Sequence, residues 1–86
     1  MSPTEQKVID EIKAVFANKG LAAPEITPRS PIDLSLGLES LDFAELAVRL
    51  EMAFGRDPFS ESTVPPLRVV ADLAALYEAE RAPRRD

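Results

Sequence analysis

The chain has 86 residues and a formal net charge of −5, from 15 acidic and 10 basic side chains, and it contains no histidine and no cysteine. It therefore has no imidazole base near neutral pH, no thiolate nucleophile and no histidine or cysteine ligand for a metal. Catalysis would have to rest on a carboxylate, a lysine or a tyrosine with a perturbed pKa. We expect a protein that acts through its surface, is not an enzyme and holds no metal.

The acidic balance also restricts the partners. Nucleic acids and anionic membranes are bound by basic residues that neutralise phosphates, so neither is expected, and a basic protein surface fits the chain better. No apolar run approaches the roughly 20 residues that span a bilayer, and the first residues lack the basic-then-apolar order of a secretory signal. We expect a cytoplasmic monomer with one domain over residues 1–80 and a frayed tail over residues 81–86.

The start of the chain predicts a helix over residues 3–18. Ser2 can cap it, Pro3 suits the first helical position, and Glu5 can reach back to the amide of the cap. Apolar side chains then recur every three or four residues, and Gly20 supplies a stop. These apolar residues are Val8, Ile9, Ile12, Val15 and Phe16.

Residues 20–39 are rich in proline and glycine and predict a long loop. Their apolar side chains would be wasted on a loose linker, so we expect an ordered loop packed by its own side chains. These side chains are Ile26, Ile32, Leu34, Leu36 and Leu38.

The strongest helical pattern covers residues 40–54 and ends at Gly55, with an apolar stripe of Phe43, Leu46, Ala47, Leu50 and Phe54. A short helical turn near residues 60–64 and a last helix over residues 67–80 follow. The expected fold is all-α, a small antiparallel four-helix bundle with three longer helices and one short one. Its expected core is Phe16, Phe43, Leu46, Leu50, Phe54, Val70 and Leu73, with the Tyr77 hydroxyl at the edge.

Ser40 stands where the long loop meets the second predicted helix, and most of the net charge of the chain surrounds it. Residues 39–61 contain six acids and two bases, a net charge of −4; these are Glu39, Asp42, Glu45, Glu51, Asp57 and Glu61 against Arg49 and Arg56. Taken alone, Ser40 is an ordinary helix N-cap, a role worth about 1 kcal/mol, and acids in a first turn are equally ordinary.

The whole segment resembles the attachment-site helix of acyl carrier proteins. That family reads Asp-Ser-Leu within a Gly-x-Asp-Ser-Leu-Asp run, then Glu-Leu, then an acidic helix end with Phe. The corresponding residues here are Leu36-Gly37-Leu38-Glu39-Ser40-Leu41-Asp42, Ala44-Glu45-Leu46 and Leu50-Glu51-Met52-Ala53-Phe54. The order of predicted helices over residues 3–80 resembles that family as well.

The resemblance implies that Ser40 receives a 4′-phosphopantetheine arm from coenzyme A through a phosphopantetheinyl transferase. The thiol of the arm would hold an acyl or aminoacyl cargo as a thioester, so the chain itself needs no cysteine. The implied partners are that transferase and an acyl or aminoacyl ligase, synthase or transferase of fatty acid, polyketide or related biosynthesis.

By the same resemblance, four acids face basic surfaces on these partners: Glu39, Asp42, Glu45 and Glu51. Such charges mainly set the rate and orientation of association. Leu41, Ala44 and Val48 are candidates for the centre of the contact, and the other interpretation of these three is packing within the core.

Two alternatives stay open. One is an unmodified acidic helical protein-interaction domain in which Ser40 is only a helix cap, and the other is a small enzyme that uses carboxylates. The chain also departs from the family pattern, because Glu39 stands where the family has Asp and because Arg49 and Met52 interrupt the acidic face. These departures favour a specialised carrier over a housekeeping fatty-acid carrier.

Overall fold

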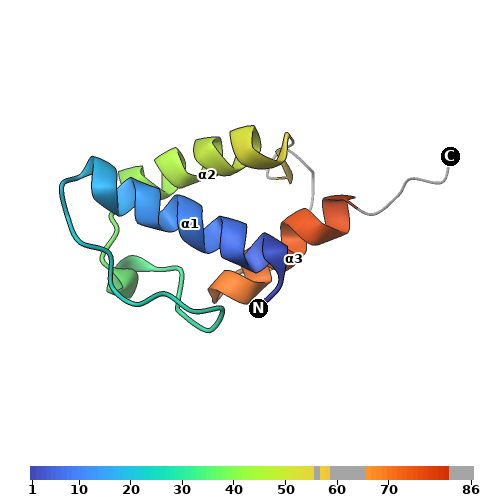
Figure 1. The fold of residues 1–86 in the computed structure, drawn as a ribbon, viewed down its shortest axis with the longest axis horizontal. Coiled ribbons are helices and arrows are strands. Elements are labelled where there is room, and N and C mark those ends of the chain that lie inside the picture. Colours follow the sequence, from blue (N-terminus) through green and yellow to red (C-terminus); the bar gives the residue numbers. More distant parts are fainter. Residues whose placement is uncertain (56, 59–65, 82–86) are drawn as a thin grey trace, which may run out of the picture.

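The computed structural model describes residues 1–55, 57–58 and 66–81, with the backbone alone for residues 79–81. Its helices are α1 (Pro3–Asn18), α2 (Ser40–Phe54) and α3 (Val70–Arg81), and a short 3-10 helix, η1 (Leu34–Leu36), lies in the loop between α1 and α2 (Figure 1). The described residues form no strand, only one isolated bridge between Pro31 and Val69. The predicted all-α fold is confirmed. The predicted short helix near residues 60–64 falls outside the described residues.

The capping box predicted for α1 is present. Ser2 Oγ accepts a hydrogen bond from the Glu5 N–H at 3.1 Å, and Glu5 Oε1 accepts one from the Ser2 N–H at 2.8 Å. Pro3 occupies the first turn, and the chain turns away from the helix at Gly20, whose φ is +75°. The predicted bounds of this helix are confirmed because both ends are encoded by local residues.

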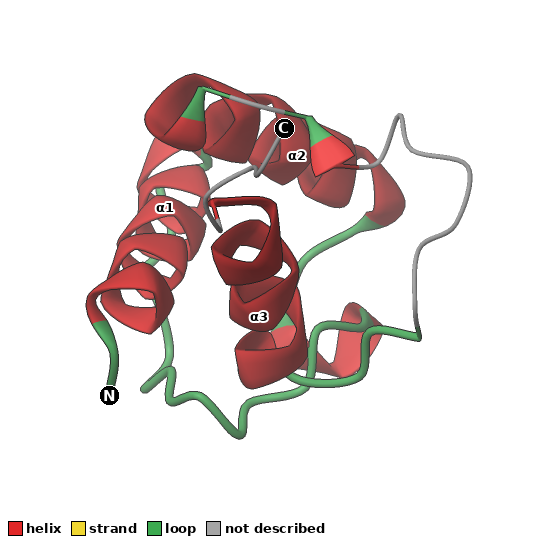
Figure 2. Ribbon diagram, turned by 90° about the vertical axis from the view of Figure 1, so that its right-hand side faces the viewer, coloured by secondary structure: helices red, strands yellow, loops and turns green. Residues whose placement is uncertain are grey.

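α1 packs against both other helices. Figure 1 shows α2 running alongside α1 in the opposite direction, and Figure 2 shows α3 beside α1 with the loop from residue 20 to residue 39 on the side away from α2. Of the predicted core, five side chains are buried, while Phe43 and Phe54 are partly buried and pack against it. The buried cluster is Val8, Ile9, Ile12, Val15, Phe16, Ile26, Leu36, Leu38, Leu46, Leu50, Val70, Leu73, Ala74 and Tyr77.

α3 begins three residues later than the predicted start at residue 67, because the residues before it bond to the long loop. The Ile32 N–H donates to the Arg68 carbonyl at 3.0 Å, and the Val70 N–H donates to the Ser30 carbonyl at 2.9 Å. The Asp72 side chain accepts hydrogen bonds from two further amides of this segment, at 3.0 and 3.1 Å. Contacts with a distant segment therefore replace a first helical turn that the apolar spacing alone had favoured.

Tyr77 is wholly buried, so the prediction that its hydroxyl lies at the edge of the core is wrong. Its ring stacks on that of Phe54 with the centroids 4.8 Å apart. Burial, with smaller contributions from the charges of Asp57 and Glu51, raises the pKa of Tyr77 to about 12.

The long loop is ordered, as predicted. Ile26, Leu36 and Leu38 are buried, and Ile32 packs partly against the core. Leu34 is the exception, since 65 % of its side-chain surface is exposed. The buried residues hold the loop to the helices and so fix the entry to α2.

Candidate functional site at the start of α2

The chain reaches Ser40 through a turn held on both sides by buried leucines, Leu36 and Leu38. Gly37 between them ends η1 with φ +112°, in the left-handed region that favours glycine. A Cβ on Gly37 would meet the ring of Phe16 at 3.4 Å, so the turn lies close against α1. Ser40 is exposed, but its backbone position is fixed by these anchors.

Ser40 is the first residue of α2 and not its N-cap, so the interpretation of Ser40 as only a helix cap is wrong. Glu39 is the N-cap, with φ −98° and ψ 171°, and its N–H donates to Asp42 Oδ2 at 2.8 Å. The amides of Asp42 and Phe43 donate to the Glu39 carbonyl. The Asp42 carboxylate thus bonds back to the amide of the N-cap residue, and the Ser40 hydroxyl takes no part in the hydrogen bonds among the described residues.

The position of Ser40 suits an attached phosphate. The first amides of a helix have no carbonyl partner within it and carry the positive end of the helix dipole. The amides of Ser40 and Leu41 are of this kind, and no hydrogen bond within the described ranges uses them. A phosphodiester on the Ser40 oxygen would therefore lie beside available donors.

Two of the four acids expected to face partner enzymes are already bonded to other side chains of the protein. Asp42 lies 2.6 Å from Lys19 Nζ, and this hydrogen bond, followed by the one from the Glu39 amide, lowers the pKa of Asp42. Glu45 accepts a hydrogen bond from Asn18 Nδ2 at 2.9 Å and lies 3.9 Å from Arg49. The end of α1 thus compensates part of the charge at the start of α2.

The other two acids, Glu39 and Glu51, are exposed and belong to none of the ion pairs in the described part of the chain. The Arg49 guanidinium, which interrupts the acidic face, contacts Glu11 on α1 at 2.9 Å. The acidic face seen in the sequence therefore consists of two uncompensated and two compensated carboxylates.

The apolar candidates lie on the surface, and the interpretation that they pack in the core is wrong. Leu41 is 80 % exposed and Val48 55 %, and Ala44 is exposed too. Met52 is 79 % exposed on the same helix, although the sequence indicated it only as a departure from a pattern. Its spacing of four residues from Val48 was the signal that could have grouped it with these residues.

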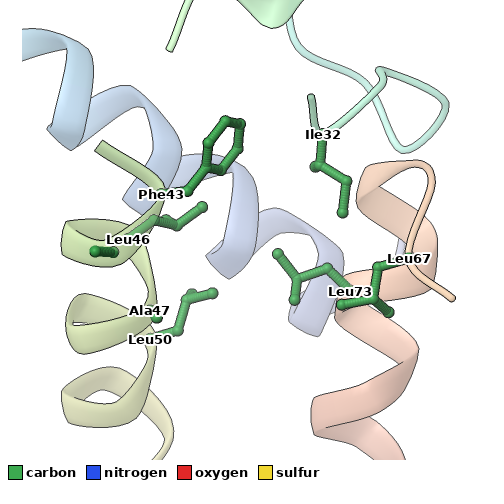
Figure 3. A pocket seen from close by; sticks show the side chains of 8 residues that line it. Ile32, Phe43, Leu46, Ala47, Leu50, Leu67 and Leu73 are labelled. Carbon is green, nitrogen blue, oxygen red and sulfur yellow. The ribbon is translucent and has the colours of Figure 1, made fainter. Parts of the chain in front are cut away.

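An apolar cavity of about 370 Å³ opens between α2 and α3, as Figure 3 shows from close by. Its described lining residues are Ile32, Phe43, Ala44, Leu46, Ala47, Leu50, Leu67 and Leu73. Three of them, Phe43, Ala44 and Ala47, follow Ser40 by three, four and seven residues. Ser40 therefore lies at the start of the side of α2 that faces the cavity. The sequence predicted that Ile32 packs within the loop and that Leu67 begins the last helix, but it did not predict that the two residues line a cavity with α2, because that depends on contacts between distant segments.

Two other kinds of feature are missing from the described part of the chain. No group of acidic side chains there could hold a metal ion. None of the helices within those residues combines the length and the apolarity that crossing a bilayer requires.

An exposed serine at a helix start, with an apolar cavity on the same side of the helix, is the arrangement of a phosphopantetheine carrier domain. The comparisons agree: the family described as "Phosphopantetheine attachment site" matches residues 10–76, and the chain belongs to this family. Within that class the chain is an acyl carrier protein. Proteins of this kind are carriers rather than catalysts, they interact with synthases and transferases, and 4′-phosphopantetheine is their expected covalent prosthetic group.

Two relatives illustrate the similarity. The chain is 29 % identical over 75 residues to the acyl carrier protein of Coprothermobacter proteolyticus, which covers 86 % of this chain and 90 % of that protein. It also resembles the solution structure of MacpD, an acyl carrier protein of Pseudomonas fluorescens involved in mupirocin biosynthesis. That match has a TM-score of 0.74 and 33 % identity, and it covers 95 % of this chain and 74 % of MacpD.

Proposed function

We propose that Ser40 is the residue that carries the 4′-phosphopantetheine arm. The observation that supports this most directly is that Glu39 is the N-cap of α2 and Asp42 bonds back to its amide, so the exposed Ser40 hydroxyl is left without an intramolecular hydrogen bond among the described residues. When attached, the arm supplies a terminal thiol that holds an acyl group as a thioester. The buried anchors Leu36 and Leu38 keep the serine in one place, so a transferase can reach it without opening the core.

We further propose that the cavity between α2 and α3 shelters the alkyl part of the cargo. Its described lining residues are all apolar, so it offers no partner for the charged amino group of an aminoacyl cargo. A dry apolar cavity of about 150 Å³ is enough to bind benzene, and this one is about 2.5 times as large. The chemistry of the lining thus favours an acyl chain over an amino acid.

The surface proposed to receive partner enzymes lies on α2 around Ser40. It consists of Glu39, Leu41, Asp42, Glu45, Val48 and Glu51, and its partners are a phosphopantetheinyl transferase and an acyl ligase or synthase with a basic docking surface. A domain over residues 1–80, a tail over residues 81–86 and a cytoplasmic monomer stay predictions, and α3 extends to Arg81.

The proposal is tested by intact mass. The apo chain is incubated with coenzyme A and a broad-specificity phosphopantetheinyl transferase, and we expect a mass gain of one arm. Ser40→Ala should show no gain, whereas Ser35→Ala, a matched change at another exposed serine, should be modified like the wild type. A wild-type chain that several transferases leave unmodified would instead be an unmodified interaction domain.

A further inference from the structure

Lys19 follows the last residue of α1 and reaches across to the start of α2. Its Nζ atom lies 2.6 Å from Asp42 Oδ2, and the two side chains are 26 % and 13 % exposed. Figure 1 shows that α1 ends at the same end of the molecule as α2 begins, which makes this contact between distant segments possible. The contact lies directly beside the candidate attachment residue, Ser40.

The backbone of Lys19 is held in place. Its N–H donates to the Phe16 carbonyl at 3.0 Å, and the Leu21 N–H donates to the same carbonyl at 3.0 Å. Phe16 is buried, and a Cβ on Gly37 would meet its ring at 3.4 Å. The end of α1 and the turn that leads to Ser40 therefore share one buried support, so Lys19 approaches α2 from a fixed position.

Two donors converge on one oxygen of Asp42. Its Oδ2 accepts a hydrogen bond from Lys19 Nζ and another, at 2.8 Å, from the Glu39 N–H. Glu39 is the N-cap of α2, and Ser40 follows it as the first helical residue. A carboxylate that also bonds to a fixed ammonium is held more firmly than one that bonds to the amide alone. Lys19 therefore steadies the group that holds the N-cap amide.

The ammonium of Lys19 is a permanent charge in this contact. The hydrogen bond to Asp42, together with the charges of Asp42, Glu39 and Glu45, raises the pKa of Lys19. Asn18 also bonds to α2, because its Nδ2 donates to Glu45 at 2.9 Å, but its amide is neutral and its partner lies beyond the capping residues. Of these two contacts, only the one made by Lys19 acts on the N-cap.

We propose that Lys19 is a positioning residue for attachment of the arm, because through Asp42 it fixes the N-cap at Glu39 and thereby the place of the Ser40 hydroxyl. The inference rests on the proposed function. In attachment, a bond forms between the Ser40 oxygen and a phosphorus of coenzyme A, and the phosphoanhydride bond to the nucleotide part breaks. The nucleotide leaves as an anion, and the serine proton passes to a base of the transferase. Lys19 takes no part in these bond changes but holds the oxygen where it can attack.

A role as a surface charge alone predicts a different kinetic result. Removing an ammonium beside acids makes this face more acidic, so a transferase with a basic docking surface would bind the variant more tightly. KM for the carrier would then fall while kcat stays unchanged. Loss of positioning instead lowers kcat and does not raise KM, because the carrier still binds but its hydroxyl is in line with the phosphorus less often.

The test is the steady-state kinetics of arm attachment by a broad-specificity phosphopantetheinyl transferase with coenzyme A, followed by intact mass. Lys19→Met should lower kcat at least about threefold without raising KM. Lys19→Arg keeps a cationic hydrogen-bond donor and should recover at least about half of the wild-type kcat. Lys13→Met is the matched control, because it removes the same charge from an exposed lysine of α1, and it should behave like the wild type.

Two further measurements ask whether Lys19 acts through Asp42. In a chain that carries Asp42→Ala, the additional change Lys19→Met should alter kcat by less than about 1.5-fold. Amide hydrogen exchange, which needs no transferase, should show the Glu39 N–H exchanging at least about threefold faster in Lys19→Met and unchanged in Lys13→Met. Circular dichroism melts establish that the variants are folded, which is expected because both lysines are exposed.

The inference is overturned if Lys19→Met keeps the wild-type kcat, if only KM changes, or if Lys13→Met loses as much. It is also overturned if Lys19→Arg recovers none of the loss, if Lys19→Met lowers kcat as strongly beside Asp42→Ala, or if the exchange of the Glu39 amide is unchanged. A wild type that no transferase modifies contradicts the proposed function as well. A modified wild type with an unaffected Lys19→Met variant contradicts this inference alone.

Discussion

Filling the cavity between α2 and α3 should stabilise the apo protein and at the same time remove the proposed shelter for cargo. Ala47 lies on the α2 wall of this cavity, between Phe43 and Leu50 along the helix (Figure 3). Ala47→Leu places three more carbon atoms in about 370 Å³ of apolar space, so the larger side chain enters without overpacking.

The magnitude follows from burial. Three carbons at about 0.8 kcal/mol each contribute about 2.4 kcal/mol. Ordering the leucine side chain costs about 0.5–1 kcal/mol, and the helix propensity of leucine costs a few tenths relative to alanine. The net gain in the free energy of unfolding is about 1–1.5 kcal/mol, which raises Tm by about 5–10 °C in a domain of this size.

Two assays read the two effects. Calorimetry of the apo protein gives Tm, and methyl NMR of Leu46 and Leu73 follows the cavity when an octanoyl-loaded arm is attached. We expect these methyl signals to shift on loading in the wild type and not in Ala47→Leu. Ala53→Leu, an exposed change on the same helix, is the matched control and should alter stability by less than about 0.5 kcal/mol.

The reasoning is refuted if Ala47→Leu lowers Tm, because the space would then be filled in the folded protein. It is equally refuted if loading shifts the Leu46 and Leu73 methyl signals as much in the variant as in the wild type, because the cargo would then not depend on this cavity.

Three further predictions concern the supports of the site. Leu38→Ala should lower the free energy of unfolding by about 2–5 kcal/mol in urea titrations, because Leu38 is only 1 % exposed. The same variant should slow the modification of Ser40, and an unchanged rate would show that Leu38 does not position the serine. Tyr77 is the single tyrosine of the sequence, and its pKa in the folded state is raised to about 12. The protonated Tyr77 therefore contributes fully to the free energy of unfolding below pH 10, and this contribution is lost as the pH rises through 12. Urea titrations across that pH range should show the loss, Tyr77→Phe should lack it, and tyrosinate absorbance appearing near pH 10 in the folded protein would contradict the assignment. The pKa of Asp42 is lowered, so this carboxylate stabilises the fold above pH 3.8 and the contribution is lost as the pH falls through the lowered value. NMR titration should place the Asp42 midpoint below 3.8 in the wild type and closer to it in Lys19→Met, and an unmoved midpoint would mean that the Lys19 hydrogen bond is not the main cause.

Structural features that depend on residues close together in the chain could be predicted from the sequence. The bounds of α1 and α2 follow from the Ser2 capping box and from Gly55, whose φ of +75° ends α2. The position of Ser40 as a candidate attachment residue followed from the motif around it. Periodicity fails where distant segments meet, as at Leu67, which lies on a helical pattern but belongs to an extended segment bonded to the long loop.

The same distinction explains the errors at the site. A serine before an amphipathic helix is usually the cap, and only the structure shows that Glu39 is the N-cap, with Asp42 bonded back to its amide from three residues further on. The Lys19 contact to Asp42 joins residues far apart in the chain, so counting charges along α2 could not reveal that this acid is compensated.

The hydrogen bonds between the long loop and the start of α3 have a consequence for the shape of the cavity. Ile32 and Leu67 come from these two segments and form one wall of the cavity with Leu73, whereas α2 forms the other. Because backbone hydrogen bonds join the loop to the start of α3, the two segments of this wall are held to each other. A change that breaks the hydrogen bonds between residues 30–32 and residues 68–70 would therefore displace Ile32 and Leu67 together and alter one whole side of the cavity.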